Sequence, residues 1–86
     1  MVVEIKTSAD CDAPSINETY VTNEIESMFP GIDVEVKFND RARGSLSVDI
    51  WDMSEAETAI AEKLLSGRNV TDYIFQNLAA DDAIWQ

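Results

Sequence analysis

Three segments of the chain alternate apolar and polar residues with the period of two that is typical of a β-strand with one buried face. The first runs from Val3 to Lys6, the second covers 32–38, and the third covers 46–50. A polar loop containing Gly44 separates the second and third segments, so we predict that these two form an antiparallel hairpin. The alternation also predicts a sheet whose open face is polar and wet, with helices covering the other face.

The first helix is predicted between a capping box at its N-terminus and a proline at its C-terminus. Ser15 precedes Glu18 by the spacing of a capping box, in which two side chains satisfy free backbone N–H groups. Pro30 ends the helix, since proline cannot continue one. Its apolar stripe contains Val21, Ile25, Met28 and Phe29.

Two more helices are predicted after the third strand. Ser54 and Glu57 form a second capping box, and the helix that follows should run from about residue 55 to 66. Gly67 is placed to end it, and Asn69 can cap a third helix. The third helix carries Val70, Ile74 and Leu78 on one face, with Phe75 beside them. The tail from residue 79 to 86 has no clear period.

The order strand, helix, strand, strand, helix, helix predicts an α+β fold in one domain over residues 1–86. We expect a two-layer sandwich, a three-stranded mixed sheet with helices on one face, in which a right-handed crossover makes the first two strands parallel. On the sheet, the predicted core residues are Val34, Val36, Leu46, Val48 and Ile50. On the helices, they are Ile25, Phe29, Ile60 and Leu64.

Composition limits the classes of partner. Seventeen acidic residues against six basic ones give a net charge of −11, which repels nucleic acid and anionic membranes and attracts basic surfaces. No apolar run approaches the roughly 20 residues that span a bilayer, and the N-terminus lacks a basic region followed by an apolar run. The single cysteine, Cys11, suits a reducing compartment. We therefore expect a cytoplasmic protein that binds neither nucleic acid nor membranes directly.

The sequence contains no constellation of residues that is typical of catalysis. Histidine is absent, and one cysteine cannot build a thiolate zinc site. Three glycines form no phosphate-binding loop, and the acids do not follow the order of a calcium-binding loop. The prediction is a non-enzymatic protein with no catalytic residue, no metal and no cofactor.

The strongest local charge lies between Gly44 and Glu62, where five acids occur with no base. Carboxylates three or four residues apart on a helix stand about 5–6 Å apart, so such a surface can imitate a row of phosphates. Glu57 is set aside because it caps a helix, while Trp51 is either tucked under the next loop or an anchor for a partner. The candidate partner-binding residues are Asp49, Trp51, Asp52, Glu55 and Glu62.

Two functions agree with this charge. The first is an inhibitor or modulator that mimics nucleic acid and occupies the basic nucleic-acid-binding surface of a partner protein. The alternative is a structural or assembly module, a homodimer or a complex subunit, whose acidity serves solubility or life in high salt. Steep salt dependence of binding would distinguish the first from the second.

Phe29-Pro30, which closes the first helix, and Ala80-Asp81-Asp82 with Trp85 near the C-terminus carry a family resemblance. With the order of elements, they make the chain similar to the DinI-like family, small proteins induced by DNA damage, with relatives in phages and virulence loci. The resemblance implies an acidic C-terminal helix that engages the recombinase RecA where single-stranded DNA would lie. It makes Asp72, Asp81 and Asp82 the second-choice site, and a phage-encoded antagonist of a host defence nuclease complex would use the same electrostatics.

Overall fold

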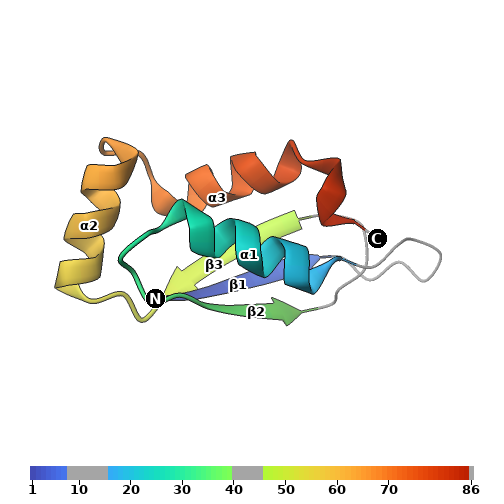
Figure 1. The fold of residues 1–86 in the computed structure, drawn as a ribbon, viewed down its shortest axis with the longest axis horizontal. Coiled ribbons are helices and arrows are strands. Elements are labelled where there is room, and N and C mark those ends of the chain that lie inside the picture. Colours follow the sequence, from blue (N-terminus) through green and yellow to red (C-terminus); the bar gives the residue numbers. More distant parts are fainter. Residues whose placement is uncertain (8–15, 40–45, 86) are drawn as a thin grey trace.

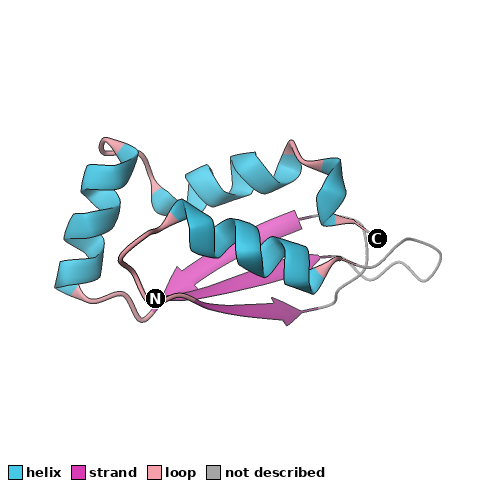
Figure 2. Cartoon of the chain, in the orientation of Figure 1, coloured by secondary structure: helices cyan, strands magenta, loops and turns pink. Residues whose placement is uncertain are grey.

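The computed structural model describes residues 1–7, 16–39 and 46–85, and within them the chain forms an α+β fold (Figures 1 and 2). This confirms the predicted fold class and the order of the strands and α-helices. The strands are β1 (Val2–Thr7), β2 (Glu35–Asn39) and β3 (Leu46–Trp51). The helices are α1 (Glu18–Met28), α2 (Glu55–Leu65), α3 (Val70–Ala79) and a short 3-10 helix, η1 (Asp82–Ile84).

The sheet has the strand order β2-β1-β3, with β1 parallel to β2 and antiparallel to β3. The parallel crossover through α1 is therefore confirmed, but the predicted hairpin of β2 and β3 is wrong, because β1 lies between them. The crossover places β2 on one edge of β1, and β3 pairs with the edge that is left. This arrangement puts the strand with the most deeply buried residues, Val3 and Ile5, at the centre of the sheet.

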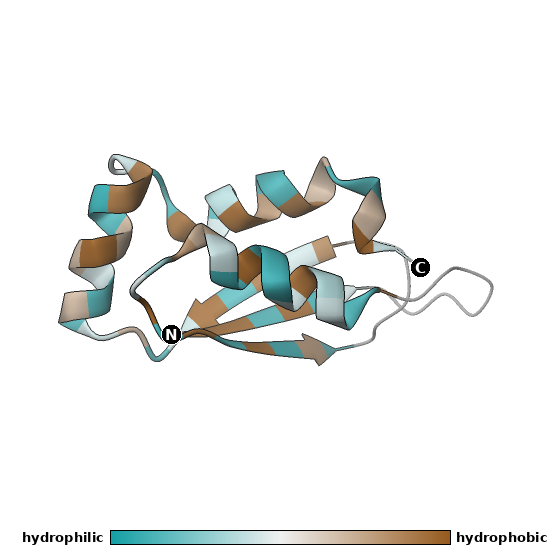
Figure 3. Cartoon of the chain, in the orientation of Figure 1, coloured by the Kyte–Doolittle hydropathy of each residue, from teal (hydrophilic) through white to brown (hydrophobic). Residues whose placement is uncertain are grey.

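The register places alternate residues of each strand on the same face. Val3 pairs with Val36 and Ile50, and Ile5 pairs with Phe38 and Val48, so this set of apolar side chains faces the helices. The strands alternate accordingly between hydrophobic and hydrophilic colours in Figure 3. The other face carries polar and charged residues over most of its area, as predicted: Glu4, Lys6, Glu35, Lys37, Ser47 and Asp49.

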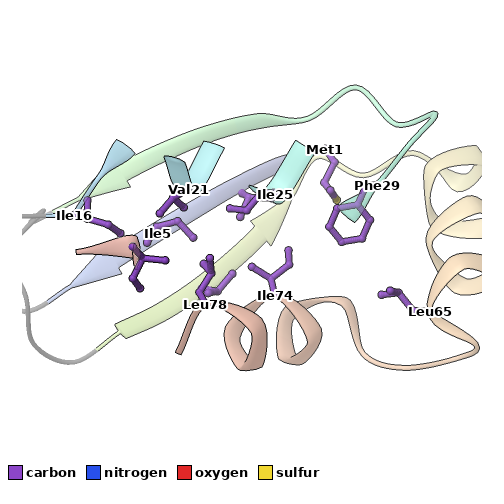
Figure 4. Packing of buried hydrophobic residues seen from close by; sticks show 12 residues of the cluster. Met1, Ile5, Ile16, Val21, Ile25, Phe29, Leu65, Ile74 and Leu78 are labelled. Atoms are coloured by element: carbon purple, nitrogen blue, oxygen red, sulfur yellow. The ribbon is translucent and has the colours of Figure 1, made fainter. Parts of the chain in front are cut away.

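The core lies between the sheet and the helices α1 and α3 (Figure 4). Val48, Ile25 and Phe29 are buried as predicted, and the rings of Phe29 and Tyr73 meet edge to face with centroids 6.4 Å apart. The remaining predicted sheet residues pack against this core and are partly buried: Val34, Val36, Leu46 and Ile50.

Helix α2 stands across the end of the sheet (Figure 1), and the prediction that its residues Ile60 and Leu64 belong to the core is wrong. Ile60 and Leu64 are 36% and 44% exposed, whereas Ala61 and Leu65 are buried. Both pairs have the helical spacing of four residues, and they occupy neighbouring stripes of the same helix. Of this buried stripe, Leu65 belongs to the core cluster.

The helix caps are local features, and most of them were predicted. The capping box of Ser54 and Glu57 is present, and Asn69 caps α3. Ser66 and Gly67 end α2 in left-handed conformations, with φ of 55° and 82°. Asn17 caps α1 through a hydrogen bond from the Tyr20 amide, so the helix begins later than the predicted box would place it. Ser15 itself lies outside the described residues.

The C-terminal segment packs against the start of α1, which the sequence did not predict. The Asn17 amide donates to the Ile84 carbonyl at 2.7 Å, and Ile16 forms a β-bridge with Trp85. Ile16 and Ile84 are both almost completely buried. The segment after α3 is therefore part of the folded domain.

Candidate acidic interface

The predicted partner-binding residues follow one another from β3 into α2. Asp49 and Trp51 point from the open face of the sheet, Asp52 lies in the connection, and Glu55 and Glu62 lie on α2. Asp52 has a φ of 59°, a left-handed conformation that aspartate adopts more readily than most residues. The connection thereby turns directly from the strand into the N-cap of α2, which brings Asp52 next to the first turn of this helix.

Asp49 is paired with a base that the local sequence did not show. Its carboxylate lies 2.7 Å from the Lys6 ammonium, which also lies 3.4 Å from Glu4. The hydrogen bond to Asp49, with that to Glu4, raises the pKa of Lys6 above its ordinary value. Because β1 is the neighbour of β3, a lysine distant in the sequence reduces the negative potential at Asp49. Among the four predicted acids, Asp49 therefore contributes least to the negative potential.

Trp51 lies at the end of β3 on the open face and is 42% exposed. Its partner in the register is Val2, and Glu35 pairs with Val2 from the other side. Val2 is only 7% exposed although it lies on the open face, since its two cross-strand neighbours flank it. Trp51 thus presents part of its aromatic surface to solvent and is not fully covered by the loop that follows.

Glu57 holds a structural position, as expected for a capping residue. Its carboxylate accepts a hydrogen bond from the Ser54 amide at 3.1 Å and one from the Met1 ammonium at 3.0 Å. The Ser54 backbone and then the Met1 ammonium hold the pKa of Glu57 below its ordinary value of 4.5. Met1 also donates to the Asp33 carbonyl at 3.1 Å, so the ammonium joins the start of α2 to the segment before β2.

Two further acids lie at this end of the molecule. Asp33 is joined to Glu57 through Met1, and Glu35 shares a row of the sheet with Trp51. Both side chains are exposed. The sequence reasoning missed them because they belong to the second predicted strand, far along the chain from Trp51. We refer to Asp33, Glu35, Asp52, Glu55 and Glu62 as the acidic end.

The surface of helix α2 has three stripes of different character. Seven residues separate Glu55 from Glu62, so they lie within about 20° of each other around the helix and about 10.5 Å apart along it. Ile60 and Leu64 each project about 160° away from Glu62. Ala61 and Leu65 form the buried stripe. One exposed flank of the helix is therefore acidic, and the flank on the other side is apolar.

The second-choice residues do not form one surface. Asp72 is exposed in the first turn of α3, and Asp82 is exposed in η1. Asp81 instead accepts a hydrogen bond from the Tyr20 hydroxyl and another from the Ala83 amide at 3.0 Å. The hydrogen bond to Asp81 raises the pKa of Tyr20 to about 12, with burial and the negative charge of Asp81 adding to the effect. Asp81 thus fastens the C-terminal segment to α1.

Within the described residues, no group of three or more histidine, cysteine or acidic side chains is placed to hold a metal ion. No helix in the described ranges is long and apolar enough to cross a membrane. No family model matches the sequence, and comparisons with curated proteins and with solved structures give no match.

Proposed function

We propose that this chain is a non-enzymatic acidic modulator that binds the basic nucleic-acid-binding surface of a partner protein. One observation carries the proposal: Asp52, Glu55 and Glu62 are exposed, form no ion pair with another described residue, and follow the exposed Trp51 along the chain from β3 into α2. Unpaired carboxylates attract lysine and arginine over a distance, and Trp51 supplies a rigid apolar anchor at close range.

The spacing on α2 supports mimicry of nucleic acid. Glu55 and Glu62 lie about 10.5 Å apart along the helix, which is close to the rise of three nucleotides of one DNA strand, at about 3.4 Å each. A surface whose basic side chains follow a phosphate backbone can therefore meet both carboxylates at once. A RecA-type recombinase and a defence nuclease complex are the two candidate partners under this proposal, since each binds nucleic acid.

The whole-molecule charge favours a basic partner over nucleic acid itself. A net charge of −11 on 86 residues accelerates association with a cationic surface and opposes approach to phosphates. This electrostatic attraction weakens as salt screens it, with a Debye length of about 10 Å at 0.1 M. Binding that depends steeply on salt is consequently the signature of this function.

The assembly module is the second candidate, and the exposed apolar residues favour it. Trp51, Ile60, Leu64 and Phe75 are between 36% and 44% exposed. Ile60 and Leu64 lie one turn apart on α2, and exposed apolar side chains that gather on one surface mark contacts with other proteins. An interface formed mainly by these residues would hold its affinity as salt rises, which separates it from the acidic mechanism.

Affinity capture at low salt, followed by mass spectrometry, tests the proposal with three versions of the chain. The first is the unmodified chain, and the second carries Asp52→Lys, Glu55→Lys and Glu62→Lys. The third is a matched control with the same charge change on α1: Glu18→Lys, Glu24→Lys and Glu26→Lys. We expect a nucleic-acid-binding protein to be captured by the first and the third and lost from the second.

A second variant tests whether the binding site lies near the C-terminus instead of on α2. If the α2 variant captures the same partner as the unmodified chain while Asp72→Lys with Asp82→Lys does not, the site belongs to α3 and η1. Capture that is equal in all versions would contradict an acidic site and support the assembly module. Asp81 is left unchanged in this variant because it holds the C-terminal segment in place.

A further inference from the structure

Strand β2 forms one edge of the sheet, and β1 is its one neighbour among the described strands (Figure 1). The Glu35 amide donates to the Met1 carbonyl at 2.9 Å, so the backbone groups of Glu35 point toward β1. Successive residues of a strand direct their N–H and C=O groups to alternate sides. Val36 and Phe38 therefore direct theirs outward, where a further extended strand can pair with them.

A groove lies beside this edge, between β2 and α1. It has a volume of about 310 Å³ and is lined by Glu18, Thr19, Thr22, Asn23, Val36 and Phe38. The two residues whose backbone groups point outward thus also contribute their side chains to the groove. Because residues opposite each other on paired strands share a face of the sheet, the groove has room for side chains of an added strand.

The charges on the open face of β2 specify which strand fits. Glu35 and Lys37 are both exposed there and form no ion pair with another described residue. Residues directly opposite each other on antiparallel strands interact through their side chains, and opposite charges stabilise the pair. A fitting antiparallel strand therefore carries a base opposite Glu35 and an acid opposite Lys37, with one residue between them.

Strand β2 of a second copy meets this requirement. With Val36 opposite Val36 of the second copy, Glu35 of each copy lies opposite Lys37 of the other. The outward backbone groups of the two Val36 residues then form a hydrogen-bonded pair, and Glu35 and Lys37 occupy the closer positions between such pairs. A shift of two residues keeps the hydrogen bonds but places Lys37 opposite Lys37, or Glu35 opposite Glu35. The charges thus favour one register.

The other edge of the sheet lacks this complementarity. Strand β3 carries Ser47, Asp49 and Trp51 on the open face and no base, so pairing two β3 strands brings no opposite charges together. The edge at β2 is therefore the one that is complementary to itself.

We propose that the chain forms a symmetric dimer through β2, in which two antiparallel β2 strands join the two sheets into one continuous sheet. Each copy contributes Glu35 to one cross-strand ion pair and Lys37 to the other. The inference goes beyond the proposed function and does not depend on it, because the acids on α2 are not part of this edge.

Sedimentation equilibrium at about 0.15 M salt measures the dissociation constant of the dimer. At this ionic strength the Debye length is about 8 Å, which limits the repulsion between two molecules of charge −11. Lys37→Glu replaces both ion pairs by like charges and should raise the dissociation constant about tenfold or more. Glu35→Lys with Lys37→Glu exchanges the two charges and should restore the dimer.

Lys63→Glu is the matched control, because it makes the same change in net charge on the exposed surface of α2. It should leave the dissociation constant nearly unchanged. All three substituted positions are exposed, so each variant should keep the melting curve of the unmodified chain.

Three results would overturn the dimer through β2. The first is an unmodified chain that stays monomeric up to about 1 mM. The second is an equal dissociation constant for Lys37→Glu and Lys63→Glu, or a charge exchange that fails to restore the dimer. The third is a dimer that Ile60→Gln with Leu64→Gln abolishes and the β2 variants leave intact, which would assign the contact to α2. Failure of the proposed function is a different result, since it concerns capture of a basic partner by the acids on α2.

Discussion

Val48→Asp should remove most of the stability of the fold. Val48 is 6% exposed, lies on the helix-facing side of β3 and pairs with Ile5, which is 1% exposed. The residues of the sheet that face the helices are uncharged, so a carboxylate at this position has no cationic partner within the sheet. The ion pair of Lys6 with Asp49 lies on the opposite face.

The magnitude follows from two contributions. Losing the burial of a valine side chain costs about 1.5–3 kcal/mol. Burying a carboxylate without a partner costs at least about 3 kcal/mol more. The sum of at least about 4.5–6 kcal/mol compares with an expected free energy of unfolding of about 4–13 kcal/mol for a domain of this size. We therefore expect Val48→Asp to lose at least about 4.5 kcal/mol of its free energy of unfolding, which is the whole stability of a domain at the lower end of this range.

Urea denaturation followed by circular dichroism at 222 nm measures this effect. Ser47→Asp is the matched control, because Ser47 is adjacent on the same strand and exposed on the open face. That variant should change the free energy of unfolding by no more than about 0.5 kcal/mol. Equal unfolding midpoints for Val48→Asp and the unmodified chain would refute the assignment of the buried face.

Three further substitutions test local features of the structure. Glu57→Gln should lower the melting temperature at pH 7, because a carboxylate whose pKa is lowered in the folded state adds stability above its unfolded pKa. The difference in melting temperature between the variant and the unmodified chain should disappear as the pH falls through the folded pKa of Glu57. A constant difference down to about pH 2 would contradict this. Tyr20→Phe removes the hydroxyl that donates to Asp81 and so loosens the contact of the C-terminal segment with α1. Hydrogen exchange at the Asn17 amide, which donates to the Ile84 carbonyl, should become faster. An unchanged exchange rate would show that the Tyr20–Asp81 hydrogen bond does not hold this segment in place. Gly67→Ala should lower the free energy of unfolding by about 1 kcal/mol, because a φ of 82° is unfavourable for a residue with a side chain. No atom lies within 4 Å of the added methyl group, so the backbone conformation alone causes the loss. An unchanged melting curve would mean that the turn changes its conformation to accept alanine.

Local signals in the sequence predicted the helices well. The capping box of Ser54 and Glu57 and the cap at Asn69 depend on residues within one helical turn, so the sequence contains all the information that they need. The buried faces of the strands also followed from alternation, as at Val48. In contrast, alternation does not say which strands are neighbours, and the predicted hairpin was wrong because β1 inserts between β2 and β3.

The candidate site depended more on contacts between distant residues. The period of α2 allows either Ile60 with Leu64 or Ala61 with Leu65 to face inward, and only packing against the rest of the molecule decides between them. The pairing of Asp49 with Lys6 joins two strands that lie far apart in the sequence. Such contacts are set by topology, which is why the sequence alone lists the acids between residues 49 and 62 but does not show that Lys6 pairs with Asp49.

Competition for a captured partner tests the proposed mimicry most directly. A fluorescently labelled single-stranded oligonucleotide is bound to the purified partner, and the chain is added while the anisotropy of the label is followed at several salt concentrations. Mimicry predicts that the chain displaces the oligonucleotide completely, with an affinity that falls steeply as salt rises and with displacement lost in Asp52→Lys, Glu55→Lys and Glu62→Lys. A ternary complex in which the oligonucleotide stays bound while the chain binds the partner would contradict it.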